Sequence, residues 1–148
     1  MGTKGDTAAS SVVLGTNTVA IMEKITDCPV IAIPASYSFS SPKEIVFPTD
    51  YKTSFKRKEL NYLMEIAKNH NANISVLHVA KEVHLSAEQE SNKVLLEDIL
   101  EGMDYSLHTL SNIKVSKGIT AFVESRGSDM VAFLNKKHFF LIVCFLHH

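Results

Sequence analysis

Glycines near the start of the chain have the type and the spacing of an anion-binding loop. Gly2, Gly5 and the pair Gly15-Thr16 form the pattern G-x2-G-x9-G-[ST]. Because glycine has no Cβ, backbone N–H groups at Gly2 and Gly5 can approach an anion closely. Gly15 and Thr16 come directly before a segment with helical apolar spacing, and the free N–H groups and dipole of a helix N-terminus favour phosphate. The segment therefore predicts phosphate binding, with a flexible glycine loop as the alternative.

Other candidate functional residues have weaker sequence patterns, and the common metal-binding and catalytic motifs are absent from the sequence. Asp50 and Val79 each end a predicted strand and are candidates for ligand contacts, with a turn residue and a core residue as the respective alternatives. His78 lies among apolar strand residues and is expected to be packed rather than catalytic. The histidines show no HxH or HExxH spacing, so no metal site is expected. The sequence also contains no G-x4-G-K-[ST] loop and no G-x-S-x-G motif.

Composition excludes several classes of protein. The chain has 148 residues, of which 45% are hydrophobic, and this suits one domain with a real core. With 15 basic and 16 acidic residues it has no general electrostatic attraction for nucleic acid. The longest apolar run covers residues 139–146, far short of the ~20 residues of a membrane helix. The two cysteines form no CxxC pair, which favours a reducing, cytoplasmic setting.

Alternating strand and helix patterns surround these candidate residues. Near-continuous apolar runs predict strands, and apolar residues at helical spacing predict helices. Ser54 is expected to cap the second helix, and Ser86 with Gln89 forms a capping box for the third. The alternation predicts an α/β domain with a mainly parallel sheet of about five strands. The expected strands are residues 29–34, 44–47 with an end at residues 48–50, 74–80, 105–110 and 130–134. The expected helices cover residues 18–26, 54–70, 86–102 and 116–127.

On these residues the chain resembles the universal stress protein family. The glycine motif and the following helix lead into Cys28-Pro29-Val30, which resembles the start of the family's last strand. Residues 44–50 resemble its first strand with the terminal acidic residue, residues 74–79 its second strand, and residues 128–132 the entry to its fourth. The resemblance covers most of the chain up to about residue 137, and the glycine motif is its most specific part.

The resemblance implies a fold, a ligand and a set of contacts. The fold would be a three-layer Rossmann-like sheet of the adenine nucleotide alpha hydrolase-like type, with residues 29–34 as an edge strand that mediates dimers. The ligand would be ATP, with or without magnesium, and the protein a homodimer, closed or domain-swapped. Asp50 would lie near the adenine or ribose, and Val79 would offer backbone atoms to the adenine. The ribose and phosphates would be held by Gly2, Gly5, Gly15, Thr16 and Asn17.

The order of the family's parts is unusual in this chain. Residues 1–35 resemble the C-terminal part of one stress domain, residues 36–43 a linker, and residues 44–137 the first four strands of a second domain. Residues 138–148 form an apolar tail that is expected to be a strand or an unordered end, with residues 139–146 buried. The leading segment could complete the sheet of its own chain, because a linker of eight residues reaches ~26 Å at ~3.3 Å per residue. It could equally pair with another chain.

Three functions of different classes are compatible with these features. The first is a nucleotide-binding stress or regulatory protein that lacks efficient catalysis, because phosphate donors are present without an evident general base or carboxylate pair. The second is a dimerisation or interaction module that has lost its ligand, since no second glycine motif follows the fourth strand. The third is an enzyme on a Rossmann-like core, which would need a polar catalytic cluster at the strand ends. We expect the first, and therefore no enzyme.

Overall fold

The fold is built on one sheet, in a computed structural model that describes residues 2–3, 20–21, 23–25, 28–35, 37–82, 84–135 and 140–145. Within these residues the sheet has seven strands in the order β1-β2-β7-β6-β3-β4-β5. All neighbouring strands are parallel except β6 and β7, which are antiparallel. The strands are β1 (Gly2–Thr3), β2 (Val30–Pro34), β3 (Glu44–Pro48), β4 (Asn73–Ala80), β5 (Tyr105–Ser111), β6 (Met130–Asn135) and β7 (Phe140–Phe145).

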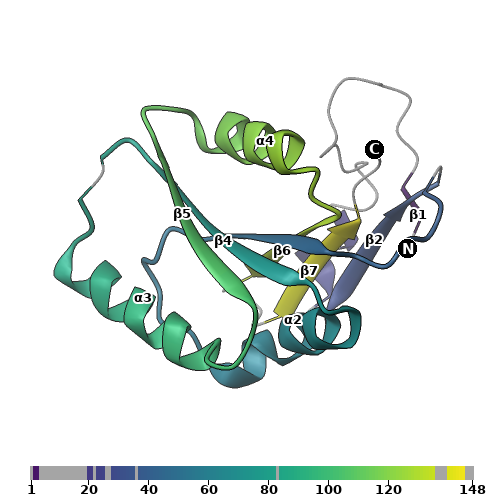
Figure 1. Cartoon of the computed structure of the whole chain (residues 1–148), viewed down its shortest axis with the longest axis horizontal. Coiled ribbons are helices and arrows are strands. Elements are labelled where there is room, and N and C mark those ends of the chain that lie inside the picture. The colour runs from purple at the N-terminus through teal and green to yellow at the C-terminus, as the bar shows by residue number, and fades with distance from the viewer. Residues whose placement is uncertain are drawn as a thin grey trace.

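Helices cover both faces of the central strands, which gives three layers (Figure 1). Helices α2 (Arg57–His70) and α3 (Ala87–Ile99) lie on one face, and α4 (Val115–Arg126) lies on the other. Residues 20–21 and 23–24 are also helical, within the predicted first helix. The structure confirms the predicted α/β class with a mainly parallel sheet.

Two apolar cores form because successive strand residues point to opposite faces of the sheet. Ile45 and Phe47 of β3 are buried against α2 and α3, in the larger core. Val46, between them in sequence, is buried against α4 in the smaller core. Such strands, covered on both faces, have the near-continuous apolar sequence that predicted them.

The helix ends follow local signals, with one difference from expectation. The Ser86–Gln89 capping box is present: Gln89 N donates to Ser86 Oγ over 3.2 Å, and Ser86 N donates to Gln89 Oε1 over 2.9 Å. Helix α2 begins at Arg57, so Lys56 rather than Ser54 is the cap residue, and its N–H donates to Glu59 Oε2 over 3.1 Å. A carboxylate three residues into the helix satisfies the free N–H there and competes with the predicted hydroxyl cap.

The sheet differs from the prediction at the edge that contains β1, β2 and β7. It has seven strands rather than about five, because residues 2–3 pair with β2 and the tail forms β7. The prediction that residues 29–34 form an edge strand is wrong, since β2 has β1 on one side and β7 on the other. The two described strands of the leading segment, β1 and β2, thus join the sheet of their own chain, and β7 lies between β2 and β6. The predicted burial of the tail side chains lies outside what the structure describes.

A topological switch point lies between β3 and β6 at the middle of the sheet. From β3 the chain proceeds outward through β4 to β5 and then returns to β6, on the other side of β3. The helix after β3 is α2 on one face, and the helix before β6 is α4 on the opposite face. Such an arrangement leaves a crevice at the carboxyl ends of the two strands, where ligands bind in open α/β sheets. In the described part of the chain, no helix is long and apolar enough to cross a membrane.

A polar network lies on the α4 face, at the opposite end of the strands. Glu44 accepts a hydrogen bond from Arg126 Nε over 2.9 Å and bonds to Ser75 and Asn73. Ser106 Oγ and His108 Nε2 are 2.8 Å apart and extend the network to β5. Burial, and then the Arg126 guanidinium, lower the pKa of His108 from its ordinary 6.5, against an opposing effect of Glu44.

This lowered pKa predicts a pH dependence of stability. The folded state favours neutral His108, so its stabilising contribution is full above pH 6.5 and is lost as the pH falls through the lower, folded-state pKa. The free energy of unfolding, measured with urea at pH 7.5 and pH 5.5, should therefore fall less in His108→Gln than in wild type. The exposed His84→Gln variant is the control and should follow wild type. Equal falls in His108→Gln and wild type would contradict the prediction.

Candidate functional site

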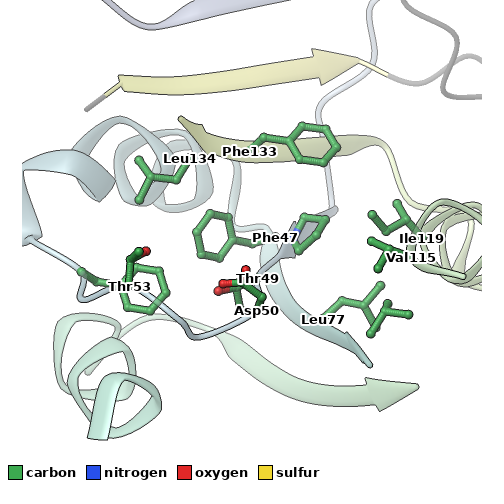
Figure 2. Close-up of a pocket in the computed structure, with 12 residues that line it drawn as sticks. Phe47, Thr49, Asp50, Thr53, Leu77, Val115, Ile119, Phe133 and Leu134 are labelled. Atoms are coloured by element: carbon green, nitrogen blue, oxygen red, sulfur yellow. The ribbon is translucent and has the colours of Figure 1, made fainter. Parts of the chain in front are cut away.

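A cavity of about 470 Å³ opens at the carboxyl ends of β3, β4 and β6, at the switch point (Figure 2). Its volume is within the range of small-molecule sites, which is roughly 300–1,000 Å³. The lining residues come from β3 and the loop after it, from β4, from β6 and from the first turns of α4. They are Phe47, Pro48, Thr49, Asp50, Thr53, Phe55, Leu77, Val79, Val115, Ile119, Phe133 and Leu134.

The polar side chains of the described cavity lining all belong to the loop after β3. Thr49, Asp50 and Thr53 supply two hydroxyls and one carboxylate, and Figure 2 shows them across the cavity from Val115 and Ile119 of α4. Hydrogen bonds within the loop hold its turns, and in the first of them Tyr51 N donates to Thr49 Oγ1 over 3.1 Å. Lys52 N donates to Asp50 Oδ1 over 2.9 Å. Short polar side chains that accept from the N–H two residues later form tight turns, so this loop carries its acceptors in a defined geometry.

The apolar wall on the α4 side depends on a close helix–strand contact. A Cβ at Gly118 would lie 2.8 Å from Val79 Cγ1, which is too close for two carbon atoms. Glycine at this position therefore lets the first turns of α4 approach the end of β4. The approach brings Ile119 and the exposed Val115 to the cavity, on the side of the smaller core that contains Leu77. No lining residue is cationic, so the described wall suits an uncharged or hydrogen-bond-donating group better than an anion.

The structure brings two of the sequence-predicted site residues to this cavity. Asp50 and Val79 both line it, at the ends of β3 and β4. Gly2 is paired with Ile33 in β1, at the far end of the sheet. From β1 to β3 the order passes β2, β7 and β6, so at ~4.8 Å per strand Gly2 lies ~19 Å from β3. Gly5, Gly15, Thr16 and Asn17 lie outside the described residues.

Most of the lining was not anticipated from the sequence. In the sequence, Phe133 and Leu134 were only the last residues of a predicted strand, and Ile119 was only a position within the predicted helix over residues 116–127. A signal did exist for Thr49 and Thr53, since both lie near the strand end that carries Asp50. His78 is packed, as predicted: it is 3% exposed and its ring lies 5.1 Å from that of Tyr51. Among the described residues, no group of His, Cys, Asp and Glu side chains could hold a metal ion.

Comparisons with known proteins gave one structural likeness. A scan of the sequence against models of protein families gave no match, and a search among curated proteins gave none either. The fold is similar to that of a universal stress protein from Archaeoglobus fulgidus, with a TM-score of 0.49 and 18% sequence identity. The similarity covers 70% of this chain and 93% of that one.

Proposed function

We propose that this chain is a universal stress protein-like nucleotide-binding protein that takes ATP, with or without magnesium, at the cavity beyond β3, β4 and β6. The observation that carries the proposal is the position of that cavity. It opens at the switch point of a mainly parallel sheet and contains Asp50 and Val79, the strand-end residues that the family resemblance associates with the base and ribose. The glycine motif would supply the phosphate contacts.

The lining chemistry supports a nucleoside in the cavity and phosphates beyond it. The aromatic and aliphatic wall, with Phe47 and Val79, can cover a flat ring, and Asp50 can accept hydrogen bonds from an amino group or from ribose hydroxyls. An anionic phosphate would lack a cationic partner among the described lining residues, so it must reach N–H donors elsewhere. Gly15 and Thr16, at a predicted helix start, are the donors that the motif provides.

Binding without efficient turnover is the simpler form of this proposal. The described lining contains one carboxylate, Asp50, and neither a lysine nor a histidine. Phosphoryl transfer needs groups that orient the nucleophile and stabilise the charge of the transition state. We therefore propose a regulatory or stress-response role. The proposal also includes a cytoplasmic location, a homodimer, and no nucleic-acid or membrane partner.

An interaction module without a ligand is the second candidate. The separation of Gly2 from the cavity and the absence of a cationic lining side chain favour it. In that case the fold would serve assembly, and sedimentation would show self-association that does not respond to nucleotide. The two candidates therefore differ in whether ATP binds at all.

Blocking the cavity provides the direct test. Thr53 lines the cavity from an exposed loop position, so Thr53→Trp would place an indole in it without disturbing the core. Calorimetry should show at least about tenfold weaker ATP binding, which corresponds to about 1.4 kcal/mol. Lys52→Trp adds the same ring at the neighbouring exposed residue, outside the lining, and should bind like wild type. The proposal fails if wild type does not bind ATP, or if Thr53→Trp binds as well as wild type does.

A further inference from the structure

Side chains from two other elements hold three successive carbonyl groups of the loop that carries Asp50. The carbonyl oxygen of Thr49 lies 3.0 Å from His78 Nδ1, and that of Asp50 accepts from Gln89 Nε2 over 2.8 Å. The carbonyl oxygen of Tyr51 accepts from Asn92 Nδ2 over 2.7 Å. A carbonyl has no hydrogen to donate, so Nδ1 of His78 must be the protonated ring nitrogen. Loop carbonyls usually face water, and three side-chain donors in succession mark a loop that is held in place.

The loop needs such anchoring because its conformation is unfavourable. Tyr51 has φ 58, in the left-handed region that a bulky residue rarely adopts. This backbone turn places the Tyr51 ring in the core, where it is 2% exposed, and leaves Asp50 on the cavity side. Burial, with smaller effects of the carboxylates of Glu97 and Glu90, raises the pKa of Tyr51 to about 12. The three donated hydrogen bonds offset the strain and select this conformation.

Gln89 joins the loop to the start of α3 through two different atoms. Its Oε1 accepts from Ser86 N in the capping box, over 2.9 Å. Its Nε2 donates to the carbonyl of Asp50, 39 residues earlier in the chain. Asn92, one turn further along α3 and 7% exposed, holds the next carbonyl. The first turns of α3 therefore set the position of a loop whose own side chains line the cavity, although neither Gln89 nor Asn92 lines it.

We propose that Gln89, Asn92 and His78 are positioning residues that fix Asp50 and Thr49 in the geometry that binds the ligand. The part of this inference that concerns the ligand rests on the proposed nucleotide function. The part that concerns the conformation of the loop rests only on the hydrogen bonds described above. Its consequence is that nucleotide affinity depends on α3, a helix that contributes no residue to the cavity lining. A residue that only stabilised the fold would leave the loop and the affinity unchanged at temperatures where the protein is folded.

The amide of Gln89 allows its two roles to be separated. Gln89→Glu keeps the oxygen that caps α3 and removes the N–H that holds Asp50. Hydrogen exchange of the Tyr51 and Lys52 amides, measured without ligand, should become roughly tenfold faster, because local opening of the loop costs less. ATP affinity should fall by about tenfold, because the acceptors of the site are no longer held in place. The midpoint of urea unfolding should change little.

Three controls exclude the alternative explanations. Ser86→Ala removes the cap hydroxyl and keeps the loop bond, so it should lower the unfolding midpoint without changing exchange or affinity. Ala87→Glu adds the same negative charge at an exposed position on the same turn and should leave affinity within about twofold of wild type. Gln89→Lys restores a donor that can reach the carbonyl of Asp50, and should recover most of the slow exchange and most of the affinity.

The outcomes distinguish this inference from the proposed function. Unchanged exchange at Tyr51 and Lys52 in Gln89→Glu would overturn the positioning role. An Ala87→Glu protein that binds as weakly as Gln89→Glu would overturn it too, because charge alone would then explain the loss. If wild type does not bind ATP, the proposed function fails, and the exchange measurements still decide whether α3 holds the loop.

Discussion

The Phe47→Ala protein is expected to lose about 3–5 kcal/mol of its free energy of unfolding, a large part of the roughly 5–15 kcal/mol that a domain has. Phe47 is 1% exposed, and its ring lies 6.3 Å from that of Phe55 in the core beneath α2 and α3. It also lines the cavity, so truncation would merge the lost volume with an existing opening. Neighbouring side chains could not collapse to fill that space, and the cost should lie toward the upper end of the range.

Urea unfolding of two matched variants tests this expectation. Phe39→Ala is the same substitution at a side chain that is 74% exposed, and it should change stability by no more than about 0.5 kcal/mol. A loss of less than about 1 kcal/mol in Phe47→Ala would show that this side chain is not part of a packed core. Where the protein stays folded, ATP affinity should also fall, since a wall of the site is removed.

The Gly15→Leu protein is expected to retain its stability and to lose ATP binding by at least about tenfold. The reason is steric: a side chain at the motif glycine would occupy the space in which backbone N–H groups approach the phosphates. The effect should be graded, so Gly15→Ala should bind more weakly than wild type and more tightly than Gly15→Leu. Calorimetric titration with ATP, with and without magnesium, measures the loss, and urea unfolding confirms that the fold is intact.

The Gly15 and Thr53 variants test different halves of the site. Loss of affinity in both would mean that the glycine motif and the cavity act on one ligand. Loss in Thr53→Trp alone would place the ligand in the cavity without the motif, and a compound without phosphates, such as adenosine, would then bind as tightly as ATP. Gly15→Leu binding ATP as well as wild type does would remove the motif from the proposed function.

Local patterns predicted most of the central fold. Near-continuous apolar runs identified β3, β4 and β6, because strands covered by helices on both faces need apolar residues at most positions. The Ser86–Gln89 box marked the start of α3, because its two hydrogen bonds form within one turn. The start of α2 was placed less well, because Glu59 satisfies the N–H of Lys56 from inside the helix.

The edge of the sheet that contains β1, β2 and β7 was not predictable from local patterns. β2 was expected at an edge, and its two neighbours come from the two ends of the chain. Pairing between β2 and β7 joins residues more than a hundred positions apart, such as Val30 and Ile142. No local pattern specifies such a partner, because the backbone groups of any strand can pair with those of any other.

The sequence by itself determined the α/β alternation and the placement of Asp50 and Val79 at the ends of strands. Both follow from hydrophobic periodicity and from the polar residue that ends a buried run. Only the tertiary structure decided that β6 returns beside β3, and this return creates the cavity by bringing Phe133 and Ile119 to the same opening as Asp50. It also decided that Gln89 holds the carbonyl of Asp50. Contacts of this kind depend on how helices and strands pack in three dimensions, which the spacing of residues along the chain does not encode.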